Sequence, residues 1–397
     1  MVGIMNLFTI SHHEYCTTSG VPRTHSVEET CKMAGGLTAE TGIVDFLDIT
    51  GKDRIGIPVW CSVRPREKLG KLTAGAGRTA SDARCAAMMG TIERYSATYA
   101  GGMMDIASYE EVGLTRAVDP EELILPRKPE FGEKLHWVPG QDILHDERVY
   151  IPANAIYHPY DPLGMANQLF RSDPNGLGAG SVPEEAIIHG IYEVIERDAL
   201  SRAEQNFSLG KRFIPEPGTP ADELMETFAG AGVDITMWLL DDTYGIPTIA
   251  AVSDDTVTRD PFMIMMAAST HPNPGVAAEC TLLKLARNRA LQIFTTEVGI
   301  HAGRSAMVEK AGYDRFKRIN RFWFADAPEV AGTDLPATDY EATDDELTAA
   351  IAAVAPHTDR ICIADLTRTA LPVWRVVIPG FEVSYIDPSR VKKRRLS

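Results

Sequence analysis

The chain has 397 residues, 44% hydrophobic and 24% charged, a globular composition long enough to bury a large core and unlike a disordered or fibrous protein. Its net charge of −16 disfavours broad attraction to nucleic acid or to an anionic membrane surface. We expect no membrane span, because no apolar run reaches roughly 20 residues. The six widely spaced cysteines are typical of reduced thiols, which predicts a cytoplasmic protein.

The first half of the chain predicts one strand and one long helix. Residues 55–63 (IGIPVWCSV) are typical of a buried strand. A helix is predicted over residues 82–99, with Thr79 as its N-cap. Residues 110–150 are rich in Pro, Gly and charge, which predicts long surface connections or a small inserted element.

The second half alternates predicted strands with long helices. The sequence Ser-Val-Pro-Glu at 181–184 predicts a capping-box start for a helix that continues to about residue 204. Further helices are predicted over 274–301 and after the acidic stretch 340–346. Strands are predicted at 234–240, 249–252, 262–268, 361–364 and 373–378. This alternation predicts an α/β fold of mixed sheets flanked by long helices.

The helix after Ser181 has two chemically different sides. At about 100° per residue, isoleucine and valine side chains gather on one side and acidic side chains with one histidine on the other. The acidic side consists of Glu185, His189, Glu193 and Glu196. Mg²⁺ would offset the repulsion between these carboxylates and link them to phosphate oxygens. An ordinary solvated helix face fits the same pattern.

Two neighbouring features could belong to the same site. The glycine-rich residues 175–180 precede the helix N-terminus, where free amides attract anions, although tight turns have the same composition. Arg197 could bind a phosphate bidentately. The Glu93-Arg94 pair on the earlier helix repeats the Glu196-Arg197 pair, so the two helices could face each other across a cleft or carry separate surface ion pairs.

Several motifs in the same order resemble the YcaO family. They are an N-terminal motif at 23–30, a first strand at 53–59, a glycine loop and acidic helix at 75–95, a second acidic helix within 175–199, and a C-terminal strand and turn at 375–382. The resemblance implies a YcaO-like α/β fold with an N-terminal segment over residues 1–55 and a catalytic-type domain over 56–397.

The resemblance also implies ATP and Mg²⁺ as cofactors. The implied metal-facing residues are Glu93, Glu185, Glu193 and Glu196. The implied nucleotide-binding residues are Arg23, Thr30, Ser181, Arg197 and Arg289. In the family a nucleophile attacks a peptide carbonyl and ATP phosphorylates the amide-derived oxygen, which is otherwise a poor leaving group. Loss of phosphate leaves a thioamide or an azoline.

The closest resemblance is to the methanogen branch that is linked to glycine thioamidation in the methyl-coenzyme M reductase alpha subunit. The last residues lack the Pro-x-Pro-x-Pro pattern of many azoline formers, so we expect sulfide as the nucleophile. The branch implies a peptide or protein substrate, a TfuA-type partner and a homodimer.

The chain departs from the family pattern at several positions of the implied site. Ala76 replaces a lysine, Ala86 a serine and Gly90 a glutamate. On the third helix Lys284 and Arg287 replace a glutamate and a glutamine. These changes predict a smaller metal load, with Lys284 or Arg287 acting as a cation against phosphate. They leave two alternatives to thioamidation: a non-catalytic paralogue that binds or regulates an active homologue, and an azoline-forming peptide maturase.

Overall fold

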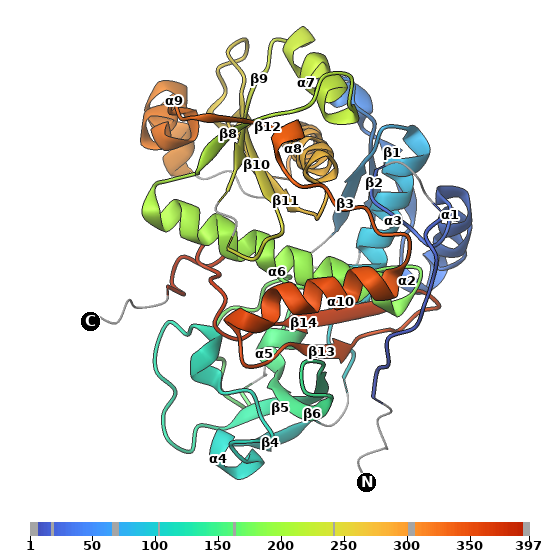
Figure 1. Ribbon diagram of the computed structural model, residues 1–397, viewed down its shortest axis with the longest axis vertical. Coiled ribbons are helices and arrows are strands. Elements are labelled where there is room, and N and C mark those ends of the chain that lie inside the picture. Colours follow the sequence, from blue (N-terminus) through green and yellow to red (C-terminus); the bar gives the residue numbers. More distant parts are fainter. Residues whose placement is uncertain are drawn as a thin grey trace.

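The described residues fold into three sheets with long helices packed between and around them (Figure 1). The computed structural model describes residues 7–16, 20–65, 71–101, 104–161, 164–240, 243–300 and 306–391. The helices are α1 (Val27–Gly36), α2 (Thr38–Thr41), α3 (Ala80–Ala97), α4 (Tyr109–Val112), α5 (Ala153–Ile156), α6 (Pro183–Asn206), α7 (Pro220–Gly230), α8 (Pro274–Glu297), α9 (Ala306–Ile319) and α10 (Thr343–Val354). The strands are β1 (Asp45–Asp48), β2 (Val59–Val63), β3 (Leu72–Ala76), β4 (Asp105–Ala107), β5 (Leu135–Asp142), β6 (Glu147–Pro152), β7 (Leu177–Ala179), β8 (Lys211–Ile214), β9 (Asp234–Leu239), β10 (Thr248–Asp254), β11 (Met266–Thr270), β12 (Glu329–Ala331), β13 (Cys362–Asp365) and β14 (Val373–Val377).

The sheets bring together strands that are far apart in the sequence. The first sheet has the order β1-β2-β3, and the second has the order β11-β10-β9-β8-β12. The third has the order β4-β5-β13-β14-β7, with β6 paired to β5. Its pairs are antiparallel, and in the second sheet β12 pairs with β8 in parallel. These mixed sheets with long helices confirm the predicted α/β class.

Helix α6 runs through the middle of the molecule, between the second and third sheets (Figure 1). Its predicted apolar side is buried against Val376 of β14 and Leu347 of α10. The buried residues of that side are Ile187, Ile188, Ile191, Val194 and Ile195. Burying this side directs the acidic residues of α6 towards α3 and α8.

Glycines let α6 approach β7 and β14 very closely. A Cβ atom at Gly178 would lie 2.0 Å from the carbonyl oxygen of Ala186, and one at Gly190 would lie 2.6 Å from a methyl group of Val376. No side chain fits in these contacts, since packed atoms do not approach within 3 Å. Part of the predicted glycine-rich loop is therefore strand β7, and its glycines serve helix–strand packing.

Strand β3 and helix α3 are packed in the same way. A Cβ atom at Gly75 would lie 2.3 Å from the amide nitrogen of Ala87. Thr79 caps α3 in a capping box with Asp82, which confirms the predicted start of this helix. Two strand–helix units thus carry the two acidic helices.

Three expectations about the elements are corrected. Residues 110–150 hold β5 and part of β6 in the third sheet, where Leu135 and Trp137 are buried. A Cβ atom at Gly140 would lie 2.6 Å from the carbonyl oxygen of Ile363, so the strand pairing there requires a glycine. The N-cap of α6 is Val182 and has no side-chain cap, so the Ser181 capping box is wrong. Helix α8 ends at Glu297, before residue 301.

The predicted boundary at residue 55 falls between two paired strands. β1 and β2 form an antiparallel pair that joins Asp45 to Val63 and Asp48 to Trp60. The two proposed parts therefore share a sheet, and the division stays a prediction. Within the described ranges, no helix is both long and apolar enough to cross a membrane.

Replacing Gly178 with alanine should destabilise the fold by about 1–3 kcal/mol or more, because the new methyl group overlaps the Ala186 carbonyl. The free energy of unfolding from denaturant titration measures this change. Gly35→Ala is the matched control: it lies in α1 with no atom within 4 Å of the added Cβ, and it should stabilise the protein by about 0.5–1 kcal/mol. Equal stability of the wild-type and Gly178→Ala proteins would contradict this account of the α6 packing.

Candidate functional site

Charged side chains from four elements lie close together beside α6. Helix α6 supplies two carboxyl groups and an arginine, α3 and α8 flank them, and β14 adds an arginine from below. Each of these side chains perturbs the pKa of at least one other. We call these residues the charged cluster: Glu93, Glu193, Glu196, Arg197, Lys284, Arg287 and Arg375.

Two glutamates of α6 are held in place by basic and amide groups. The Lys284 ammonium donates to Glu196 Oε2 at 2.6 Å and to the Ala268 carbonyl at 2.8 Å. Arg197 Nη1 lies 3.2 Å from Glu196 Oε1, without hydrogen-bond geometry. Glu193 accepts from the Gly176 amide at 3.0 Å and from Arg197 at 3.3 Å. The turn before β7 therefore orients a site carboxylate directly.

Glu93 on α3 lies near enough to Glu193 on α6 for their charges to act on each other. Burial raises the pKa of Glu93 to about 8, and repulsion by Glu193 adds to the shift. Burial also raises the pKa of Glu193, while Arg197 opposes this shift. Among the described residues Glu93 has no ion-pair partner. Two adjacent carboxyl groups with raised pKa values favour a cation between them.

The cluster has more basic groups than carboxyl groups, four against three. Arg287 donates to Asn288 Oδ1 at 3.2 Å and has no carboxylate partner within the described ranges. Burial and the nearby Arg94 lower the pKa of Arg287. The buried Nε atoms of Arg197 and Arg375 have no hydrogen-bond partner among the described atoms. An anion with several oxygens, such as a triphosphate, would satisfy these donors.

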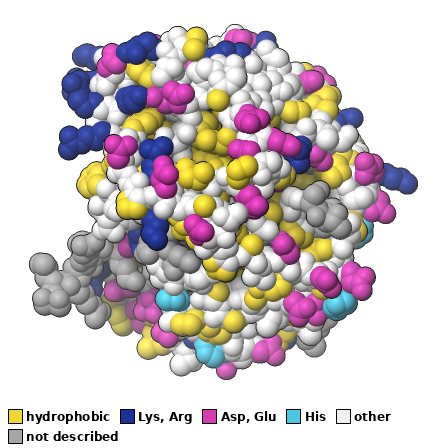
Figure 2. All heavy atoms as spheres, turned by 45° about the horizontal axis from the view of Figure 1, so that its top comes forward, with side chains coloured by type: hydrophobic (Ala, Val, Ile, Leu, Met, Phe, Trp, Pro, Cys, Tyr) yellow, Lys and Arg dark blue, Asp and Glu magenta, His cyan; other side chains and the backbone are white. Residues whose placement is uncertain are grey.

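The excess of basic groups in the charged cluster is local, because the protein as a whole is acidic. On the face in Figure 2, acidic side chains are spread among the others, whereas Lys and Arg gather mainly towards one edge. The side chains of Glu193, Arg197 and Lys284 are 19%, 25% and 31% exposed, so solvent reaches the cluster. A small anion can therefore reach positive charge that the net charge of −16 conceals.

Glu185 organises a second group next to the cluster. Its carboxylate accepts from the amides of Thr24 at 2.6 Å and Ser181 at 2.7 Å, and the residue is 3% exposed. The Thr30 and Ser181 hydroxyl oxygens lie 3.4 Å apart. Burial lowers the pKa of His189, and the nearby Arg23 adds to the shift. The predicted nucleotide contacts Arg23, Thr30 and Ser181 thus lie near one another, and Glu185 binds the two backbone amides that hold this group together. Its metal-binding role stays a prediction.

Arg289 is also bound by groups of the protein itself. Its guanidinium is fully buried and donates to Asp53 at 2.8 Å and to Asp255 at 2.9 Å. Burial disfavours ionised Asp255, but hydrogen bonds from Arg54 and Arg289 hold its pKa below the usual range. Its donors are engaged by buried carboxylates inside the protein, so Arg289 stabilises the fold, and its nucleotide contact stays a prediction.

The described residues contain no group of three or more His, Cys, Asp or Glu side chains that could hold a metal ion unaided. Mg²⁺ often needs only one or two protein carboxylates, because substrate phosphates and water complete its octahedron. Glu93, which has no ion-pair partner among the described residues, and Glu193, which is bound by Arg197 alone among the described basic side chains, could meet that requirement, whereas both Lys284 and Arg197 lie against Glu196. The residues present therefore fit a magnesium–nucleotide complex with fewer protein ligands than the four glutamates predicted.

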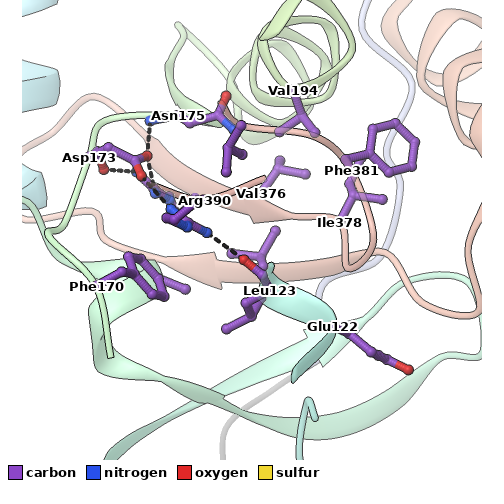
Figure 3. A pocket seen from close by; sticks show the side chains of 14 residues that line it. Glu122, Leu123, Phe170, Asp173, Asn175, Val194, Val376, Ile378, Phe381 and Arg390 are labelled. Atoms are coloured by element: carbon purple, nitrogen blue, oxygen red, sulfur yellow. Dashed lines mark hydrogen bonds and ion pairs between the residues drawn. The ribbon is translucent and has the colours of Figure 1, made fainter. Parts of the chain in front are cut away.

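A pocket beside the cluster holds residues that the sequence did not single out (Figure 3). Asp173 binds Arg375 through its backbone carbonyl at 3.0 Å and Arg390 through its side chain at 3.0 Å. The Arg390 guanidinium lies 3.7 Å from the centre of the Phe170 ring. Asp173 thereby links the C-terminal segment to the charged cluster. Of these residues only Arg375 lay in a family-like motif, so sequence patterns did not indicate the others.

Known proteins are similar to this chain in sequence and in fold. A family model described as YcaO cyclodehydratase, ATP- and Mg²⁺-binding, matches residues 74–382. An uncharacterized protein of Methanothermobacter thermautotrophicus is 39% identical over 384 residues, 94% of this chain and 98% of its own length. A Rhizobium leguminosarum bv. trifolii protein from the tfuA 3′ region is 25% identical, over 84% of this chain and 82% of its own. The structure of YcaO from Methanopyrus kandleri bound with AMPPCP and Mg²⁺ has a TM-score of 0.80 and 26% identity, covering 97% of this chain and 99% of that one. The chain belongs to the YcaO family.

Proposed function

We propose that the chain is an ATP- and Mg²⁺-dependent enzyme that activates a peptide backbone amide for attack by sulfide, which yields a thioamide. The main support is the charged cluster, in which, among the described residues, Glu93 has no ion-pair partner and Arg287 has no carboxylate partner. One Mg²⁺ and a triphosphate together would satisfy both deficits. This combination is the ligand set of the family.

Each part of the site has a chemical task in this proposal. Glu93 and Glu193 would hold the metal, while Arg197, Arg287 and Arg375 would bind phosphate oxygens. Arg23, Thr30 and Ser181 would bind the nucleotide from the other side of α6. Bound ATP supplies the phosphoryl group that makes the amide oxygen a good leaving group. Fixed cations around that oxygen stabilise the developing negative charge more than water does.

Lys284 would reduce the number of Mg²⁺ ions that the site binds. Its ammonium lies 2.6 Å from Glu196, at the position where the family pattern has a glutamate. We infer that this lysine takes the place of a second cation beside Glu196. The protein then needs fewer divalent ions but keeps a positive charge next to the phosphates.

The 39% identical relative from a methanogen supports a glycine of the methyl-coenzyme M reductase alpha subunit as the substrate. The similarity to a protein from a tfuA region supports a TfuA-type partner, which would help to deliver sulfur. A homodimer and a cytoplasmic location complete the proposal.

Two other functions fit part of the same site. A non-catalytic paralogue is favoured by the Lys284–Glu196 ion pair and by the small residues Ala86 and Gly90 on α3. An azoline-forming peptide maturase would use the same nucleotide site with a side-chain nucleophile in place of sulfide.

Incubation with ATP, Mg²⁺, sulfide and the reductase glycine peptide should release phosphate and exchange one peptide oxygen for sulfur, as mass spectrometry detects. In Glu193→Gln, Mg²⁺-dependent nucleotide affinity should fall at least about 10–100-fold, because a metal-facing charge is lost. Glu297→Gln, at the exposed end of α8, is the control and should bind normally. Nucleotide binding without phosphate release, with or without a TfuA-type protein, would favour the non-catalytic paralogue.

Lys284→Glu should make nucleotide binding depend on a higher Mg²⁺ concentration, because the buried Glu196 then needs a second metal ion. Calorimetric titrations at several Mg²⁺ concentrations measure the shift. Lys284→Met separates charge from size, and it should weaken binding at every Mg²⁺ concentration. An unchanged Mg²⁺ dependence in Lys284→Glu would show that the lysine does not replace a cation.

Magnesium–nucleotide binding should strengthen as the pH rises towards 8, because Glu93 must lose its proton to bind the metal. Calorimetry at pH 7 in two buffers of different ionisation enthalpy should show about one proton released per nucleotide, and less in Glu93→Gln.

The stability of the ligand-free protein should have the opposite pH dependence. The pKa of Glu93 is higher in the folded protein than in the unfolded chain, so its contribution to stability is complete below the unfolded pKa and is lost as the pH rises through about 8. Glu93→Gln should therefore be more stable than wild type above pH 8, and identical stability curves would contradict the buried-carboxyl account.

A further inference from the structure

A basic segment lies on the surface near the C-terminal end of α6. Residues 306–325 hold α9 and the 3-10 turn that follows it (Arg321–Phe324), and they carry five basic and two acidic side chains, although the whole chain has a net charge of −16. Helix α9 lies at the upper left of Figure 1, towards the edge where Lys and Arg gather in Figure 2. The charge of this segment is therefore opposite to that of the protein as a whole.

Three exposed arginines of this segment have no carboxylate partner. Arg315, Arg318 and Arg321 follow one another at intervals of three residues, which places them along one side of α9 and of the turn that continues it. Within the described part of the chain none of them forms an ion pair, whereas the neighbouring Lys317 pairs with Asp254. The three guanidinium groups are thus available to a partner.

Exposed apolar side chains lie beside these arginines. Phe207, the C-cap residue of α6, is 74% exposed, and its ring meets the ring of Phe322 edge-on, with the centroids 5.6 Å apart. Phe322 directly follows Arg321, and Ile319, which directly follows Arg318, is 62% exposed. We call the three arginines together with Phe207, Ile319 and Phe322 the α9 patch.

The backbone of Phe207 has a conformation that disfavours a bulky side chain. Its φ is 50°, in the left-handed region where a glycine usually ends a helix, and the next amide, that of Ser208, donates back to the Ala203 carbonyl at 3.0 Å. This conformation costs free energy, and most of the ring gains nothing from burial. The protein therefore holds an aromatic side chain in solvent where a glycine would fold better, which points to contact with a partner.

Helix α6 fixes the α9 patch relative to the candidate site. Arg197 of the charged cluster and Phe207 lie about 15 Å apart along the axis of this helix. Beneath the patch, the fully buried Trp323 shares a core cluster with Leu200 of α6, and its carbonyl accepts from the Trp238 indole at 3.1 Å. An extended peptide covers about 15 Å with about five residues, so one peptide can reach both places.

We propose that the α9 patch binds an acidic segment of the peptide substrate, about five or more residues from the amide that reacts. The arginines pair with the carboxylates of this segment, and Phe207 and Ile319 cover an aromatic or aliphatic side chain between them. The inference rests on the proposed peptide-modifying function, and it adds the class of substrate sequence that the enzyme selects.

Charge favours an acidic peptide over a nucleic acid at this patch. Phosphates would meet the same arginines, but a long polyanion would also meet the rest of a protein whose net charge is −16. A short acidic segment meets the basic patch alone. The exposed Phe207 and Ile319 also fit a peptide that carries an apolar side chain among its carboxylates.

The test measures binding of a fluorescein-labelled peptide to the full-length protein by fluorescence anisotropy, without ATP, Mg²⁺ or sulfide. The peptide holds a glycine with the run Glu-Phe-Glu-Glu on each side, about five residues away, and a second peptide has serines in place of both runs. The acidic peptide should bind at least about tenfold more tightly than the serine peptide, and its affinity should fall as the salt concentration rises.

Arg318→Glu and Arg321→Glu should each weaken binding of the acidic peptide about five- to tenfold, and neither should change binding of the serine peptide. Lys128→Glu reverses an exposed charge in the loop before β5 and is the matched control, which should bind as the wild type does. Phe207→Gly should also weaken binding, yet raise the midpoint of thermal unfolding, because glycine suits a φ of 50°. Weaker binding by a more stable protein does not come from misfolding.

Equal affinity of the wild type for the two peptides would overturn the proposal, as would unchanged binding in both arginine variants. A single-stranded RNA that binds more tightly than the acidic peptide, and loses affinity in the same variants, would show that the patch serves a nucleic acid instead. The binding assay involves no chemical step. A failure of phosphate release or thioamidation would therefore count against the proposed function alone, whereas a failure of this assay would count against the α9 patch alone.

Discussion

The close contact of α6 with β7 and β14 is the constraint on which the site depends. Gly178 and Gly190 leave no room for a side chain between helix and strands, so α6 has one position along its axis and one rotation about it. In that position Glu193 meets the Gly176 amide, and Glu196 points towards α8. A shift of α6 by the width of a methyl group would move both carboxylates away from their partners.

Helix α3 meets β3 through a second glycine contact, at Gly75, and the two strand–helix units bring Glu93 to Glu193. Carboxyl groups that are enclosed together resist ionisation, so the protein alone does not complete this part of the site. The neighbouring arginines add positive charge that the protein does not fully balance, since Arg287 has no carboxylate partner among the described residues. The site is thus built to be completed by a ligand that carries both metal and phosphate.

The substitution pattern of the chain changes how charge is balanced without changing the architecture. Lys284 pairs with Glu196, and this contact neutralises one carboxylate of the charged cluster, whereas the carboxyl groups of Glu93 and Glu193 keep pKa values that burial raises. The Lys284 ammonium belongs to the chain and does not dissociate as a metal ion does, so the neutralisation of Glu196 does not depend on the Mg²⁺ concentration. The same helix carries Arg289, whose buried pairs with Asp53 and Asp255 hold α8 to the first and second sheets.

The sequence by itself determined the α/β class, the two acidic helices and the apolar side of α6, because periodicity and capping are local properties. The family resemblance in the sequence also predicted that Glu93, Glu193, Glu196 and Lys284 belong to one site. Only the tertiary structure decided their roles. Glu185 faces two backbone amides, Arg289 faces two buried aspartates, and Asp173 and Arg390 meet from segments more than 200 residues apart. A glutamate that binds metal and one that binds an amide look the same in a helix, since the difference lies in what the rest of the chain places opposite them.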